Sequence, residues 1–192
     1  MLWKQKTFAL VSAAVTAGLG LVLAANAAEV GRSNAETQVG GVQMKPYKNA
    51  KWNFALEIPA RWNVAPPVSS NSPSELIRFV SNENGVHRVI VFRDPYDPTV
   101  SPEVHVAQIQ TGLAQQNFAH FVTGETRIGS RAVRTLDFDR PRADGKTWSC
   151  REYFIIDGTL NYTLGFGTTD RKAMFGVYDR MAKSFTFGIA PG

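Results

Sequence analysis

The residues that could perform acid–base or metal chemistry are few and lie far apart in the sequence. The three histidines, His87, His105 and His120, form neither the H-x-x-x-H nor the H-E-x-x-H spacing of a helical metal site. Asp94 and Asp97, in the segment DPYDP, could offer oxygen ligands to a hard cation such as Ca²⁺, but without the spacing of an EF-hand. Aspartates among prolines are also typical of an ordinary turn, so Asp94, Asp97 and His87 are weak metal candidates.

Nucleophilic or two-carboxylate chemistry has equally little support. Cys150 is the only cysteine, and it could act as a nucleophile beside a histidine. It shares one face of a predicted strand with Trp148 and Phe154, which favours a small buried thiol. Glu152 is a misfit on that apolar face, and nothing in the sequence pairs it with Asp157 as a glycosidase would require. We therefore expect no catalysis and no cofactor. A small hydrolase or metal-dependent enzyme is the alternative if the histidines and carboxylates converge in a cleft.

Basic residues give the one candidate binding site. They are densest between Arg127 and Arg151, and Arg140, Arg142 and Lys146 fall in a single predicted loop, RPRADGK. Long basic side chains in one loop can converge on an anionic surface, and with Arg151 these residues form our predicted binding site. A solvated hairpin loop is the alternative interpretation. Aromatic residues do not interleave with the basic ones on one predicted face, so we expect no nucleic-acid partner.

The first 27 residues have the pattern of a secretory signal peptide. Two lysines precede an uncharged, mostly apolar run, and Ala25-Asn26-Ala27 supplies the small residues that a signal peptidase reads. We predict cleavage after Ala27 and export to the periplasm. A retained anchor is the alternative, because the run is nearly long enough to span a bilayer. No second apolar run is long enough to do so.

The remainder has the size of one domain. It keeps 19 of the 21 basic residues and all 16 acidic ones, and its formal charge of +3 is mildly basic. The polar, Gly-containing residues 28–45 are predicted to be a flexible N-terminal segment, and residues 46–189 a single domain. The single cysteine excludes an intramolecular disulfide, and the sequence does not specify an oligomeric state.

Hydrophobic periodicity predicts a mixed α and β domain. Apolar residues at every second position indicate strands, and a helix is expected to start at Ser101-Pro102-Glu103, which has an N-cap hydroxyl followed by proline. The uninterrupted run Val89 to Phe92 indicates a central strand that is buried on both faces. Hairpin turns such as Asn84-Gly85 and Asp157-Gly158 favour antiparallel pairing. The predicted strands are 52–58, 75–81, 87–93, 121–128, 131–139, 147–156 and 160–166, with another starting near Trp62, and the predicted helices are 102–117 and a closing one from about 169 that carries the apolar stripe Met174, Val177, Tyr178, Met181 and Phe185.

This order of elements resembles the PsbP-like family. The resemblance rests on Tyr47-x-Asn49, on Phe54-x-Leu56-x-Ile58-Pro59-x-x-Trp62 and on the closing Lys183-Ser184-Phe185, and it covers about residues 45–187. It implies an α+β fold in which helices flank an antiparallel sheet as an α/β/α sandwich. It also implies a non-catalytic accessory, assembly or adaptor protein that binds a protein partner at a membrane-associated complex. For a cyanobacterial protein the compartment would be the thylakoid lumen. A periplasmic carrier of a small ligand or lipid is the alternative, and it would need a large apolar pocket between sheet and helix.

Overall fold

The computed structural model describes residues 38–39, 41–68, 72–82 and 87–187. The elements follow one another as β1 (Gln38–Val39), β2 (Val42–Asn49), β3 (Phe54–Pro59), β4 (Asn63–Ala65), β5 (Glu75–Val80), β6 (His87–Pro95), α1 (Pro102–Ala114), β7 (Ala119–Ile128), β8 (Arg131–Pro141), β9 (Thr147–Asp157), β10 (Leu160–Thr168), α2 (Arg171–Lys183) and β11 (Thr186–Phe187). Among the described helices, none combines the length and apolar character needed to cross a membrane.

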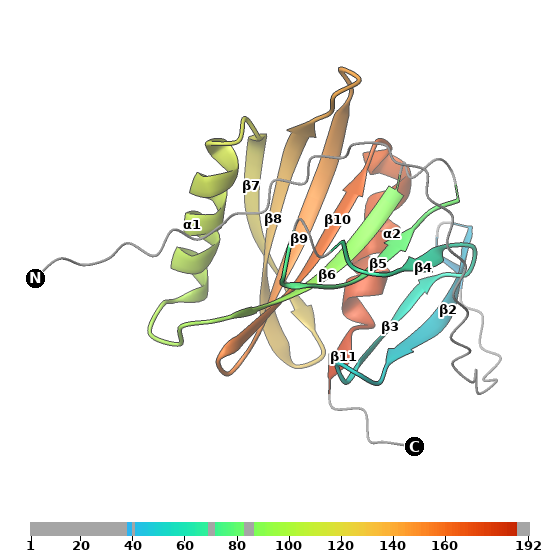
Figure 1. The fold of residues 1–192 in the computed structure, drawn as a ribbon, viewed down its shortest axis with the longest axis horizontal. Coiled ribbons are helices and arrows are strands. Elements are labelled where there is room, and N and C mark those ends of the chain that lie inside the picture. The colour runs from blue at the N-terminus through green and yellow to red at the C-terminus, as the bar shows by residue number, and fades with distance from the viewer. Residues whose placement is uncertain (1–37, 40, 69–71, 83–86, 188–192) are drawn as a thin grey trace, which may run out of the picture.

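Two antiparallel sheets form the body of the fold (Figure 1). The larger has seven strands in the order β4-β5-β6-β10-β9-β8-β7, and the smaller has four in the order β1-β2-β3-β11. Helix α1 packs on strand β8, whereas α2 lies against β10 and against β3 of the smaller sheet. The predicted α+β class is therefore confirmed, with helices on both sides of an antiparallel sheet.

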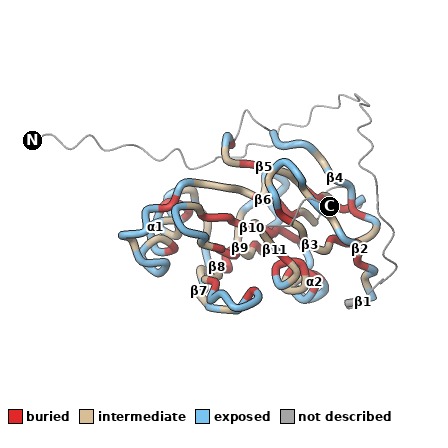
Figure 2. The backbone as a smooth tube through the Cα atoms, turned by 90° about the horizontal axis from the view of Figure 1, so that it is seen from below, coloured by how far each residue is buried: buried red, intermediate tan, exposed pale blue. Residues whose placement is uncertain are grey.

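Each face of the larger sheet is covered by its own apolar core, and Figure 2 shows the buried segments running along its strands. This burial on both faces explains why β6 reads as a continuous apolar run: its predicted central position is confirmed, and Val89 and Val91 are fully buried. The core between the larger sheet, α2 and the smaller sheet includes Phe54, Phe79, Leu164, Tyr178 and Met181. The core beneath α1 consists of Val106, Leu113, Leu136, Phe138, Trp148, Cys150 and Phe154.

Both helices begin at caps that the sequence supplies. The Ser101 hydroxyl accepts a hydrogen bond from the Val104 N–H at 3.3 Å, as expected for the predicted helix start. Helix α1 ends at Ala114, three residues before the predicted end, because Asn117 adopts a left-handed φ of 63°. Asp170 caps α2, and all five residues of the predicted apolar stripe are buried, although the last of them, Phe185, lies just beyond the end of the helix.

Two features of the architecture differ from the prediction. Strand β2 occupies residues 42–45 of the segment predicted to be flexible, so the ordered domain begins before residue 46. Its inward residue Met44 is only 2% exposed, but one apolar residue among polar neighbours gives no detectable period. The sheet predicted as one is also divided in two. The predicted signal peptide and the Asn84-Gly85 turn lie outside the described residues.

The position of Phe54 generates a stability prediction. Its fully buried ring stacks on Phe185 with centroids 5.4 Å apart, which joins the smaller sheet to the end of α2. Phe54→Ala should lower the free energy of unfolding by about 3–5 kcal/mol, through lost burial and the cavity left behind. Val64→Ala, at a strand position that is 45% exposed, should change it by less than about 1 kcal/mol. Urea unfolding measures both, and equal losses would contradict this account of the core.

Candidate functional site

The three histidines do not converge on a common site. Nδ1 of His87 lies 2.7 Å from the Thr168 hydroxyl, whereas His120 is on the edge strand β7, 81% exposed, with its Nδ1 2.9 Å from the Asp139 carboxylate. His105 lies on α1, where burial lowers the pKa of its imidazole. Within the described part of the chain, no three side chains of His, Cys, Asp and Glu are grouped so that they could hold a metal.

The two aspartates of the DPYDP segment serve local contacts instead. The Asp94 carboxylate accepts a hydrogen bond from the Ser74 hydroxyl. The Asp97 carboxylate accepts hydrogen bonds from the Thr99 N–H at 2.9 Å and from its hydroxyl at 2.7 Å, which is a closed Asx turn. These contacts match the ordinary-turn interpretation of the segment.

Cys150 and Glu152 lie on the face of the larger sheet that α1 partly covers. Burial raises the pKa of the Cys150 thiol to about 12, so its nucleophilic thiolate is not populated at neutral pH. Burial also raises the pKa of Glu152 to about 7. Its Oε1 atom is 3.8 Å from the place that a Cβ atom on Gly165 would occupy, so the carboxyl group lies over bare backbone.

The structure separates Arg151 from the other three predicted binding residues. Its guanidinium group binds both carboxylate oxygens of Asp137, at 2.6 and 2.8 Å, and reaches Asp179 of α2 at 2.8 Å. It also stacks over the Phe175 ring, 4.5 Å from its centroid. Arg151 therefore ties the sheet to α2. Trp148 lies three positions before Arg151 in β9. Because successive residues of a strand point to opposite faces, the two side chains lie on opposite sides of the sheet.

Arg142 and Lys146 close the hairpin between β8 and β9. The Arg142 N–H donates to the Lys146 carbonyl at 2.8 Å, and Gly145 takes a positive φ of 77°, which glycine adopts without strain. The Arg142 side chain pairs with Asp144 at 3.0 Å and lies over the Trp148 ring, with Cζ 5.4 Å from the centroid. The predicted loop is thus an ordered turn next to an aromatic side chain.

Trp148 also brings in a residue that the sequence analysis missed. Arg88, on the interior strand β6, stacks on the Trp148 indole with its Cζ 4.0 Å from the ring centroid. Arg140 faces Trp148 across the β8–β9 register and lies over the Phe118 ring. We call Arg88, Arg140, Arg142, Lys146 and Trp148 the Trp148 cluster. The only signal for Arg88 in the sequence was a basic residue at the start of an apolar strand.

Gly167 makes the contact between Arg88 and Trp148 possible. It lies on β10 between them, paired with Arg88 on one side and with Cys150 on the other. A Cβ atom at Gly167 would lie 2.7 Å from Cζ3 of Trp148, so only glycine lets the indole cross the strand. Burial, together with the neighbouring Arg140 charge, lowers the pKa of Arg88 to about 10, which leaves it cationic at neutral pH. The cluster is therefore a preformed group of positive charges on strands β6 and β8 and on the turn between β8 and β9.

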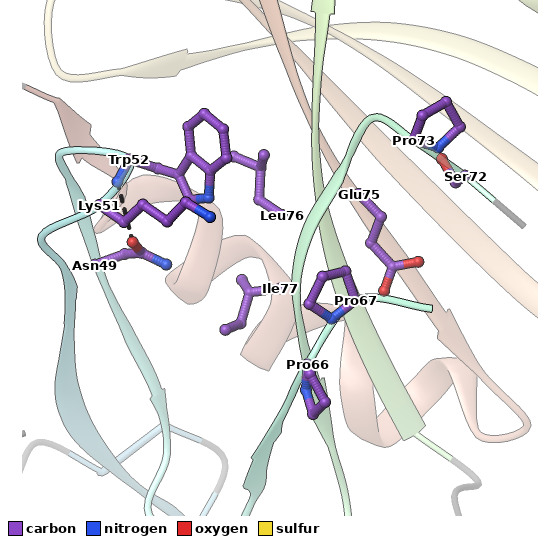
Figure 3. Close-up of a pocket in the computed structure, with 10 residues that line it drawn as sticks. All are labelled: Asn49, Lys51, Trp52, Pro66, Pro67, Ser72, Pro73, Glu75, Leu76 and Ile77. Atoms are coloured by element: carbon purple, nitrogen blue, oxygen red, sulfur yellow. Dashed lines mark hydrogen bonds between the residues drawn. The ribbon is translucent and has the colours of Figure 1, made fainter. Parts of the chain in front are cut away.

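A cavity of about 610 Å³ lies elsewhere, where the β2–β3 turn approaches β5 and the segments flanking it (Figure 3). Its most deeply buried charge, Glu75, is already bound by Arg78 at 2.6 Å. The predicted carrier pocket would lie between a sheet and a helix, whereas no residue lining this cavity belongs to α1 or α2. The lining residues are Asn49, Lys51, Trp52, Pro66, Pro67, Ser72, Pro73, Glu75, Leu76 and Ile77.

Comparisons with known proteins identify the fold. The sequence matches no protein-family model, and no curated protein shows significant similarity to it. The structure is similar to that of cyanobacterial PsbP (CyanoP) from Synechocystis sp. PCC 6803, with a TM-score of 0.60 at 12% identity over 81% of this chain and 98% of that chain. It is also similar to the Ran-binding protein Mog1p of Saccharomyces cerevisiae, with a TM-score of 0.56 at 10% identity over 76% and 96% of the two chains. LpqN of Mycobacterium tuberculosis, described as involved in cell envelope biogenesis, gives a TM-score of 0.52 at 15% identity over 77% and 92%. The PsbP-like resemblance is thus confirmed at the level of the fold.

The steric role of Gly167 predicts an effect of a single methyl group. Gly167→Ala should displace the Trp148 indole and lower the free energy of unfolding by about 1–3 kcal/mol, the usual cost of overpacking. Gly176→Ala is the matched control, because an added Cβ there meets no atom within 4 Å. In the interior of α2 it should stabilise the protein by up to about 1 kcal/mol. Urea unfolding and the near-ultraviolet dichroism of tryptophan test both variants, and an unperturbed Gly167→Ala protein would contradict the packing described.

The environment of Glu152 predicts a pH-dependent stability. Its pKa rises from an ordinary value of 4.5 to about 7 on folding, so the folded state holds this proton more tightly. The contribution of Glu152 is therefore favourable at low pH and is lost as pH rises from about 5 to 8, a loss of about 2 kcal/mol. Glu152→Gln should stabilise the protein at pH 8 by that much more than at pH 5. Unfolding free energies of both proteins at each pH measure the difference, and an equal effect at the two pH values would refute the assignment.

Proposed function

We propose that this protein is an exported, non-catalytic accessory protein, and that it binds a protein partner through the Trp148 cluster. The observation that supports the proposal is the cluster itself. The guanidinium groups of Arg88 and Arg142 lie over one indole, Arg140 is paired with Trp148 in the β8–β9 register, and Lys146 closes the adjoining turn. Strands β6, β8 and β9 and the β8–β9 turn hold these groups, so binding them costs little conformational entropy.

The fold is compatible with such a role. Among proteins of this fold, Mog1p is described as Ran-binding and LpqN as involved in cell envelope biogenesis. The scattering of the histidines and carboxylates, and the raised pKa of Cys150, give the enzyme alternative no supporting geometry in the described residues. Export rests on the N-terminal sequence pattern alone.

The proposal predicts that reversing the charge of the hairpin abolishes partner capture. The full chain, tagged at its C-terminus, would be crosslinked in intact cells and purified. Wild type should recover one defined complex, and the variant carrying Arg140→Glu, Arg142→Glu and Lys146→Glu should lose it. The contacts of exposed charges are largely electrostatic, so recovery without crosslinking should also fall as salt is raised.

A matched control separates this surface from net charge. Lys48→Glu, Arg61→Glu and Lys172→Glu reverse the same number of charges at exposed positions outside the cluster. This control variant should capture the complex as wild type does. Equal recovery by the hairpin variant and wild type would refute the proposed surface, and equal loss from both variants would assign binding to overall charge.

A further inference from the structure

Arg88 stands apart from most of the arginines that the structure describes. Arg78, Arg151 and Arg180 each pair with a carboxylate, respectively Glu75, Asp137 and Glu57. Arg88 is half-buried, yet none of the carboxylates in the described residues forms an ion pair with it. A half-buried cation that forms no ion pair with a described carboxylate is unfavourable, so this position favours an anionic ligand.

The charges around Arg88 increase this demand. The positive charges of Arg140 and Arg78 disfavour the cationic form of Arg88. The negative charge of Glu75 favours it, but both oxygens of this carboxylate are already bound to Arg78. Cys150 also faces Arg88 but remains a neutral thiol. The local balance is therefore positive, with Arg88 and Arg140 as neighbouring guanidinium groups.

We propose that Arg88 and Arg140 bind a side-chain carboxylate from an acidic segment of the partner protein, with Trp148 holding Arg88 in place. This inference rests on the proposed function and specifies the chemistry of its partner. A guanidinium group presents paired N–H donors that match the two oxygens of a carboxylate, and stacking at 4.0 Å on Trp148 fixes the plane of Arg88. Arg142 and Lys146, at the hairpin, would contact further acidic residues of the same segment.

The geometry favours an acidic protein segment over other anions. Arg88 belongs to an interior strand, where it pairs with Val80 and Gly167, whereas Arg142 and Lys146 lie at the hairpin, so a flat lipid surface would meet the hairpin before Arg88. Trp148 is 8% exposed and its ring faces the guanidinium groups, which leaves no aromatic surface for stacking bases.

The experiment titrates the purified chain with a fluorescent hexaglutamate peptide and follows anisotropy at low salt. A hexaglutamine peptide, inorganic phosphate and phosphatidylglycerol vesicles are the comparison probes. Wild type should bind hexaglutamate most tightly and hexaglutamine not at all. Arg88→Gln should weaken hexaglutamate binding by about tenfold or more, the usual effect of losing a charged hydrogen-bonded pair. Arg88→Lys keeps the charge but loses the paired donors, so it should fall between them.

The outcomes distinguish this inference from the proposed function. Unchanged hexaglutamate binding by a folded Arg88→Gln protein would overturn the inference, even if the hairpin variant still lost its partner in cells. Stronger binding of phosphate or of vesicles than of hexaglutamate by wild type would overturn it as well. If the melting temperature shows that Arg88→Gln is unfolded, Arg88→Lys and Arg140→Gln replace it in the test. Wild-type affinity for hexaglutamate in both of these variants would then overturn the inference.

Discussion

Asp137 is the charge on which the arrangement of α2 and the larger sheet depends. Its side chain is 7% exposed and accepts hydrogen bonds from Arg151 and Arg171, at 2.6 to 2.9 Å. Arg151 continues to Asp179 on α2, and the Tyr153 hydroxyl donates to the same carboxylate. A buried carboxylate is tolerated when cations and hydrogen bonds surround it, so this network links side chains of α2 to side chains of β8 and β9. It holds Asp137, Arg151 and Tyr153 on the face of the larger sheet that α2 covers.

The alternation of side chains along β8 and β9 divides the basic residues between two roles. Arg151 faces α2 and stabilises the fold, whereas Arg140 faces the opposite side, where Trp148 and Phe118 lie. Closeness in the sequence could not show that Arg140 and Arg151 have different roles, because successive side chains of a strand point to opposite faces of the sheet. The loop RPRADGK was visible in the sequence, since an aspartate followed by a glycine favours a turn.

Local patterns predicted most of the strands and both helices, and they failed where long-range pairing decides. The stripe on α2 and the apolar run in β6 are each readable within a few residues. The second sheet could not be predicted in this way, because β2 contains Pro46 and its apolar residues alternate weakly. Strand β2 is recognised only through its pairing with β3 and through the contact of Tyr47 with Phe79, whose ring centroids are 4.9 Å apart. Arg88 was missed for the same reason: it meets Trp148 only because Gly167, far away in sequence, lies between them.

The contact across Gly167 also divides the Trp148 cluster into two electrostatic environments. Arg142 pairs with Asp144 at the hairpin, where salt screens its interactions and exposed pairs contribute little energy. Arg88 is half-buried against the indole, where water is partly excluded and a charged hydrogen bond is stronger. In such an arrangement the outer charges attract a partner and set the association rate, while the inner guanidinium group discriminates among partners. A ligand with one well-placed carboxylate therefore gains more from Arg88 than a diffuse negative surface does.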